Sequence, residues 1–314
     1  MTGRRSKIVS NSADVRLDVR FLGAPLVSLY GVPVKFRSRK VLALFVFLVL
    51  EGGVHRRERM VDLLWPDSTG SRGQATLRST LSRLREALGE AAEVLQADTI
   101  GVQVTLGDHD QVDVDRLRHV VDAIEVSLDD AAGLVGGPFL EGFSVDGSPE
   151  FDDWMARWAA TCQGASTALC DRLSEQALRH GRLDMAEELG ADWQRLAPFD
   201  DGPVARLIEV DARRGARASA LERFARYSDL LESELGAQPG AVLCALADRV
   251  RGGDLAHASP EEAIRRHLGE ARAALDRADA REAVVALDQA APLLGVVGPA
   301  GEAEFTLPVL ETRA

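Results

Sequence analysis

The sequence has few of the residues that mark secreted, membrane-embedded or metal-dependent proteins. Aromatic residues make up only 5% of its 314 positions, and its three cysteines form neither a C-x-x-C motif nor a metal-ligand spacing. We expect Cys162, Cys170 and Cys244 to be small core residues in a reducing cytoplasm. The longest apolar run, residues 41–50, is too short to span a bilayer and suits a buried helix. The basic residues 1–14 lack an apolar stretch, so we predict no signal peptide.

Motifs of the common enzyme classes are also missing. The chain contains no H-E-x-x-H, no G-x-S-x-G and no glycine-rich dinucleotide loop. The glycines of residues 295–304 are not followed by Gly-Lys-Ser/Thr, which excludes a P-loop. Asp152 and Asp153 are neighbours on an expected helix, so their side chains diverge by about 100° and would not share a site. The sequence therefore predicts a protein that is not an enzyme and that has no cofactor and no metal site.

Positive charge is lacking in the chain as a whole but not in its first third. The net charge is −12. Residues 1–92 carry 16 Lys and Arg against 8 Asp and Glu, a balance of +8, whereas residues 93–314 carry 21 against 41, a balance of −20. A basic head on an acidic body is typical of a DNA-binding domain joined to a domain that does not bind DNA.

The segment 71-SRGQATLRSTLSRLREALGE-90 predicts an amphipathic helix. Leucines recur at i, i+4, i+7 and i+11, the stripe that one helix face needs to be buried: Leu77, Leu81, Leu84 and Leu88. Ser71 followed by Gln74 fits a capping box at the start of the helix. Gly89 fits a left-handed stop at its end.

The face of this helix opposite the leucines is cationic, with small hydroxyls between the charges. Two interpretations are open: a solvated helix face, or a helix that lies in a DNA groove, where arginine can bond a guanine edge or a phosphate. The candidate contact residues are Arg72, Thr76, Arg78, Ser79, Ser82 and Arg83.

The surrounding segments favour the DNA groove. Residues 15–36 alternate apolar and polar positions, which predicts two or three short antiparallel strands. Helices are predicted over 38–51 and 56–65, and a β-hairpin over 93–106. This order predicts a winged helix-turn-helix over 15–110, in which the third helix enters the major groove. Arginines near the starts of the first two helices are candidates for phosphate contacts: Arg39, Arg56, Arg57 and Arg59.

From residue 112 onward the chain reads as helices with a 34-residue repeat. Gly181 recurs as Gly215 and Ala186 as Ala220, and Trp193 falls opposite Tyr227. This period is the tetratricopeptide signature, and stacked helix pairs of that kind bind proteins or small ligands.

The overall prediction is a mainly α protein. Its parts are a basic flexible N-terminus (1–14), a winged helix-turn-helix (15–110), a tetratricopeptide-like domain (111–252), an additional helical hairpin (257–294) and a loose tail (295–314).

This order of parts resembles the bacterial regulators of the AfsR/DnrI/RedD type, or SARP-like regulators. In that family an OmpR-like winged helix precedes a bacterial transcriptional activator domain (BTAD). The matching stretches cover about three quarters of the chain, and the most specific are Leu-Ser-Arg-Leu-Arg at 81–85 and Glu-Leu-Gly-x-x-Pro at 234–239. One departure is the wing tip, which has Asp98 and no Lys or Arg from 86 to 115. This departure puts a minor-groove contact by the wing in doubt.

The resemblance implies binding to short direct repeats in double-stranded DNA near promoters. It also implies contact with RNA polymerase and a homodimer or higher oligomer formed through the BTAD. We expect a cytoplasmic, nucleoid-associated activator without membrane partners; a small-molecule effector is compatible with the repeats. The alternative is a tetratricopeptide-type interaction or ligand-sensing scaffold whose winged helix is not the main working site.

Overall fold

The chain folds into two compact units, and the division between them falls at Ala168 and Leu169. The computed structural model describes residues 16–68, 70–123, 127–128, 131, 133–253, 268–269, 271–272, 274 and 287. The predictions for 1–14 and 295–314, and most of the hairpin predicted over 257–294, lie outside these residues. None of the described helices is long and apolar enough to cross a membrane.

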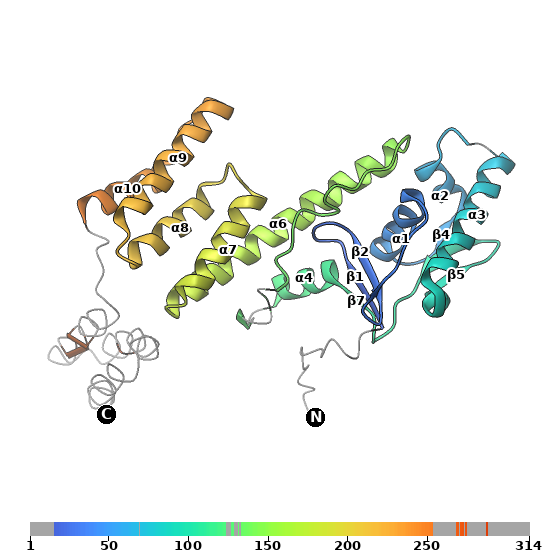
Figure 1. The fold of residues 1–314 in the computed structure, drawn as a ribbon, viewed down its shortest axis with the longest axis horizontal. Helices are drawn as coiled ribbons and strands as arrows, with labels where there is room; N and C mark the ends of the chain where they lie inside the picture. Colours follow the sequence, from blue (N-terminus) through green and yellow to red (C-terminus); the bar gives the residue numbers. More distant parts are fainter. Residues whose placement is uncertain are drawn as a thin grey trace. The chain divides into compact units, whose positions relative to one another are not determined.

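The first unit opens with a small sheet whose strand order is β3-β2-β1-β7 (Figure 1). The first three strands pair antiparallel, as the alternating pattern predicts, with Val19 opposite Val27. β7 pairs with β1 in parallel, which the sequence did not predict because two residues are too few to show a pattern. The strands are β1 (Leu17–Arg20), β2 (Leu26–Leu29), β3 (Val32–Pro33) and β7 (Gln111–Val112).

Three helices follow, as predicted: α1 (Arg39–Glu51), α2 (Arg57–Leu64) and α3 (Gly70–Leu88). α1 begins after Ser38, whose hydroxyl accepts a hydrogen bond from the Val41 amide at 3.4 Å. The apolar run of α1 is buried almost throughout because α1 packs against α2, α3 and the wing strand β6. The mixture of a small sheet with many helices confirms the predicted fold class.

The start of α3 differs from the prediction. The helix already includes Gly70 and Ser71, so Ser71 is not its cap. The Gln74 amide Nε2 lies 3.4 Å from the Glu58 carboxylate of α2 instead of returning to Ser71. The predicted capping box is therefore wrong, because a neighbouring helix supplies the partner. The predicted stop is confirmed, since Gly89 has a φ of 55°.

The predicted hairpin is confirmed as the antiparallel pair β5–β6, and β4 extends it. A short 3-10 helix, η1 (Gly89–Val94), leads into it from α3; the strands are β4 (His55–Arg56), β5 (Leu95–Ala97) and β6 (Gly101–Val104). At the wing tip the Asp98 carboxylate accepts hydrogen bonds from the Ile100 and Gly101 amides at 2.7 and 2.9 Å. Hydrogen bonds from the Gly101 and Ile100 amides lower the pKa of Asp98, so this acidic tip stays ionised.

The apolar core of the first unit continues past residue 110. Phe151, Trp154 and Cys162 of α6 (Pro149–Arg179) belong to the same buried cluster as the winged helix core. The start of α4 (Asp113–Asp122) is fixed to the sheet because the Asp113 carboxylate accepts hydrogen bonds from two amides at the end of β1. The winged helix and the segment that follows it therefore fold as one unit.

Two of the three cysteines, Cys162 and Cys170, are buried and are expected to react slowly. Cys162 and Cys170 are 3% and 0% exposed, whereas Cys244 is partly exposed. Burial raises the pKa of the Cys162 and Cys170 thiols to about 12. These two thiols are core residues, as predicted.

A partly buried ion pair connects the start of β1 to the turn before β7. Arg16 donates to the two Asp110 oxygens at 2.9 and 2.7 Å, and the Gly107 amide donates to Asp110 at 2.8 Å. Burial acts to raise the pKa of Asp110, but the hydrogen bonds from Arg16 and Gly107 outweigh it and lower the pKa below its ordinary 3.8. The pair therefore stabilises the fold only while Asp110 is ionised.

Asp110 is expected to make the free energy of unfolding depend on pH in acid. Because its folded pKa lies below its unfolded value, its contribution is complete above about pH 4 and is lost as the pH falls through the folded pKa. Urea unfolding of the full chain from about pH 6 to about pH 2 measures this loss. Asp110→Asn should be less stable at neutral pH and show a flatter acid slope; an unchanged slope would contradict the assignment.

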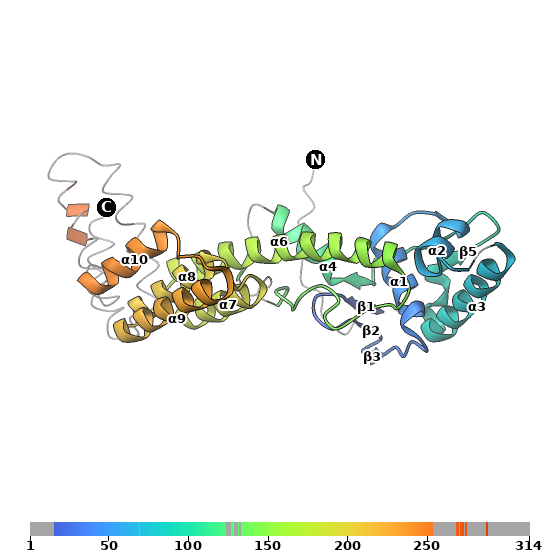
Figure 2. The same ribbon diagram turned by 90° about the horizontal axis from the view of Figure 1, so that it is seen from above.

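The second unit is built from helix pairs that repeat every 34 residues, as predicted. Its helices are α7 (Leu183–Leu196), α8 (Asp201–Arg213), α9 (Arg217–Leu235) and α10 (Ala241–Gly252). Within this unit α7 packs on α8 and α8 on α9 (Figure 2). The turns at Gly181 and Gly215 have φ values of 69° and 74°. Ala186 and Ala220 are fully buried at equivalent places.

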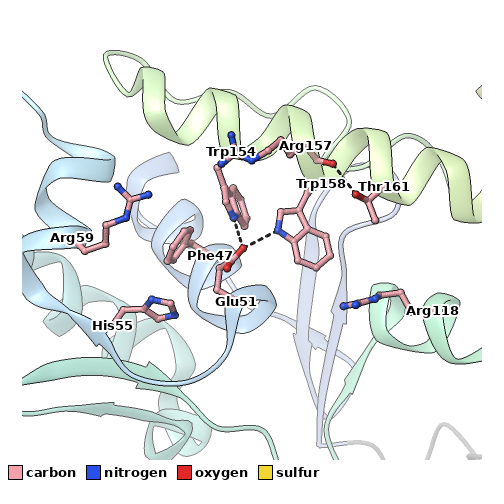
Figure 3. A pocket seen from close by; sticks show the side chains of 9 residues that line it. All are labelled: Phe47, Glu51, His55, Arg59, Arg118, Trp154, Arg157, Trp158 and Thr161. Carbon is pink, nitrogen blue, oxygen red and sulfur yellow. Dashed lines mark hydrogen bonds between the residues drawn. The ribbon is translucent and has the colours of Figure 1, made fainter.

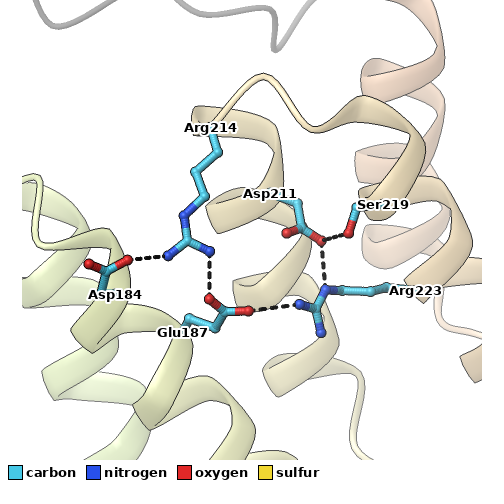
Figure 4. A network of polar contacts seen from close by, with 6 residues as sticks. All are labelled: Asp184, Glu187, Asp211, Arg214, Ser219 and Arg223. Atoms are coloured by element: carbon cyan, nitrogen blue, oxygen red, sulfur yellow. Dashed lines mark hydrogen bonds and ion pairs between the residues drawn. The ribbon is translucent and has the colours of Figure 1, made fainter.

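A polar network joins α7, α8 and α9 (Figure 4). At its centre the buried Asp211 accepts hydrogen bonds from Ser219 Oγ at 2.9 Å and Arg223 Nε at 2.6 Å. Arg223 also bonds Glu187 at 3.0 Å, and Glu187 pairs with Arg214 at 2.5 Å. Each helix thus contributes charge to the network, which fixes the stacking of one repeat on the next.

Asp211→Ala is expected to lower the free energy of unfolding by about 2 kcal/mol, because it leaves the Arg223 guanidinium without its buried partner. Chemical unfolding followed by circular dichroism measures the loss. Asp184→Ala removes a carboxylate whose side chain is 96% exposed in the same network, and should change stability by less than about 0.5 kcal/mol. Equal effects of the two variants would show that burial of Asp211 is not what matters.

Candidate nucleic-acid interface

The helix α3 is amphipathic, as the leucine pattern predicts, and it carries the candidate recognition face. All four leucines of the stripe are buried at 0–2% exposure, so the opposite face points away from the core. Arg72, Thr76, Ser79 and Arg83 gather within about 40° of one line on that face at 100° per residue. Arg78 and Ser82 lie on its flank. All six candidates are exposed except Thr76, which is half-buried.

The arginines of this face are free to meet a ligand. The guanidinium groups of Arg72, Arg78 and Arg83 make no hydrogen bond or ion pair with any residue that the structure describes. The hydroxyl of Thr76 donates to the Arg72 carbonyl at 3.0 Å, so its oxygen remains only as an acceptor. A row of guanidinium donors separated by small side chains can approach a groove edge or a phosphate closely.

Three of the four phosphate candidates are already bonded to other residues. Arg57 donates to the Asp98 carbonyl of the wing at 2.8 Å. Arg59 pairs with Glu150 at 2.5 Å, and Arg39 donates to the Ser144 hydroxyl at 3.0 Å. Arg56, exposed on β4, makes no such bond among the described residues.

The residue that precedes α2 is Arg56, and its side chain makes no capping hydrogen bond. The ring nitrogen Nε2 of His55 lies 2.7 Å from the Gly52 carbonyl, so it orders the loop before β4.

Sequence reasoning missed the residue that lets α3 approach α2. A Cβ atom on Gly73 would lie 2.5 Å from the Ser68 carbonyl and 2.5 Å from a Val61 methyl, so only glycine fits there. The available signal was a glycine inside an otherwise helical pattern, which often marks close packing. Gly73 thereby sets the position of the recognition face.

Groups of three or more His, Cys, Asp or Glu close enough to hold a metal ion do not occur among the described residues.

Comparisons with known proteins find a family match for residues 110–251. Residues 110–251 match the family model of the bacterial transcriptional activator domain. Among solved structures, the chain is similar to Mycobacterium tuberculosis EmbR in complex with low affinity phosphopeptide, with a TM-score of 0.58 and 21% sequence identity. The match covers 76% of this chain and 65% of the EmbR chain. A search of curated proteins finds no match.

The family match begins next to β7, directly after the wing, and ends within α10. The structure has a winged helix before this point and helical repeats after it, and the likeness to EmbR shows that a similar fold is known over 76% of the chain. Residues 110–251 therefore match a bacterial transcriptional activator domain, and in this chain they follow a winged helix.

Proposed function

We propose that the protein binds DNA sequence-specifically through α3 and activates transcription from promoters that carry direct repeats. The observation that supports this most is the exposed row of arginines on the third helix of a winged helix fold, since none of their guanidinium groups is bonded to a described residue. The BTAD match supports a role in transcription independently of that row.

The size and chemistry of α3 suit a major groove. Its 19 residues extend over about 28 Å at 1.5 Å per residue, and a groove about 12 Å wide admits one helix. Arginine recognises guanine through two parallel hydrogen bonds, which needs a guanidinium that no protein carboxylate already holds. Arg72 and Arg83 meet that condition among the described residues, whereas Arg59 would first have to leave Glu150.

The wing takes a smaller part in this proposal. The ionised Asp98 at its tip would repel phosphates, and Arg57 is held by the Asp98 carbonyl. We assign phosphate contacts mainly to Arg56 and to the flanking Arg78 of α3. Two copies in the cytoplasm, at the nucleoid, would occupy half-sites about one helical turn apart. The acidic BTAD would hold the copies together and contact RNA polymerase.

Selection of genomic fragments by the full chain at near-physiological salt tests the proposal. Enrichment of a short direct repeat upstream of a few operons is the expected result. The enriched site should then lose affinity with salt along a log–log slope near −5, if two copies together neutralise about six phosphates. A scaffold that works through its repeats would enrich no sequence. DNA retained without sequence preference would contradict the recognition role of α3.

A further inference from the structure

A pocket in the first unit lies where the winged helix packs against α4 and α6 (Figure 3). It has a volume of about 550 Å³, within the range of small-molecule sites. We call it the indole pocket. Its walls include three aromatic residues and three arginines: Phe47, Trp154, Trp158, Arg59, Arg118 and Arg157.

The single acidic side chain that lines the pocket is already occupied. Glu51 Oε1 accepts hydrogen bonds from Trp154 Nε1 at 2.6 Å and from Trp158 Nε1 at 3.0 Å. Although burial acts in the opposite direction, these indole hydrogen bonds lower the pKa of Glu51, and the positive charge of Arg157 adds to this effect. The carboxylate therefore holds the two indoles in place, and among the described residues it forms no ion pair with an arginine of the pocket.

The three arginines of the pocket differ in whether their guanidinium groups are already bonded to another side chain. Arg59 is paired with Glu150. The guanidinium groups of Arg118 in α4 and Arg157 in α6 make no hydrogen bond or ion pair with the described residues; Arg157 accepts a hydrogen bond from the Thr161 hydroxyl only through its backbone carbonyl, at 3.0 Å. The Arg118 guanidinium lies 5.7 Å from the centre of the Trp158 ring, which holds it over an aromatic surface. Two guanidinium groups with free donors thus stand beside indole and phenyl walls.

This combination fits one class of ligand. Free guanidinium donors recognise a carboxylate through two parallel hydrogen bonds, and flat aromatic walls favour a flat apolar body. We propose that the indole pocket binds a small organic carboxylate with a flat apolar body, with Arg118 as the main anchor of its charge. The pocket is lined by residues of the winged helix and by residues of α4 and α6, so such a ligand would contact the winged helix and these two helices together. The proposal is independent of DNA binding by α3.

Binding of 2-naphthoate to the full chain, measured by titration calorimetry, tests the proposal without DNA. At about 0.3 kcal/mol per non-hydrogen atom, a ligand of this size should bind with a dissociation constant of the order of 1 mM. The neutral 2-naphthylmethanol should bind at least about tenfold more weakly, because it cannot form the charged bidentate contact. Inorganic phosphate should not compete, since it lacks the apolar body.

Arg118→Met keeps the apolar stem and removes the guanidinium, and should weaken 2-naphthoate binding about tenfold or more. Arg116→Met is the matched control, because Arg116 is exposed on the same helix but does not line the pocket. It should bind as the parent chain does. Both replaced residues are exposed, so both variants should fold. No binding by the parent chain, equal binding by the Arg118 variant, or equal binding of the alcohol would each overturn the proposal, as would competition by phosphate.

Discussion

Arg83→Ala is expected to weaken binding to the selected DNA site by about tenfold to a hundredfold, which corresponds to about 1–3 kcal/mol. Arg83 lies on the central line of the exposed α3 face and is held by no described residue, so its full bonding capacity is available to a base. Its loss should also relax specificity at one base pair. Quantitative binding to the site and to its single-base variants measures both effects.

The loss of affinity on different DNA sequences shows whether Arg83 contacts a base or only a phosphate. If it contacts only a phosphate, binding should weaken by a similar factor on every sequence, and the salt slope should become shallower by about 1. Arg249→Ala is the charge-matched control, since Arg249 is exposed on α10 in the second unit. That variant should bind as the parent chain does. Unchanged binding of the Arg83 variant to all DNA would remove Arg83 from the interface.

Gly73→Val is expected to lower the free energy of unfolding of the first unit by about 3 kcal/mol, because its side chain must enter space filled by the Ser68 carbonyl and Val61. The better helix propensity of valine offsets only a few tenths of a kcal/mol. The clash also moves α3 away from α2. DNA affinity should therefore fall even under conditions in which the variant is still folded.

Ala75→Val is the control for this change. Ala75 lies two residues further along α3 on the exposed side, so the same valine there meets no packed neighbour and should cost less than about 1 kcal/mol. Chemical unfolding of both variants gives the difference. If the two lost stability equally, close packing at Gly73 would not explain the loss.

The periodic elements of this fold could be predicted from the sequence, and the partners of individual side chains could not. The leucine stripe of α3 and the 34-residue repeat depend on spacing along one chain, which a sequence displays directly. The two-residue strands β4 and β7 are too short to carry a pattern. Gln74 fits a local capping motif, but its partner in space is Glu58, sixteen residues earlier.

The candidate interface shows the same limit. The exposed arginines of α3 follow from helix geometry alone. The pairing of Arg59 with Glu150 depends on a contact across 91 residues, and no local pattern reveals it. The indole pocket is lined by residues of α1, β4, α2, α4 and α6, which are far apart in the sequence. In the sequence, two tryptophans at i and i+4 indicate only packing, and their shared hydrogen-bond partner Glu51 is visible only in the structure.

The contrast between the buried and the accessible cysteines has a practical consequence for chemical labelling. A maleimide reacts with thiolates, and Cys162 and Cys170 are both shielded from solvent and held as protonated thiols near neutral pH. Cys244 on α10 is partly exposed. The natural chain should therefore take up one dye at Cys244 without any engineered change. Such a dye would report from the activator domain while α3 and the indole pocket stay chemically untouched.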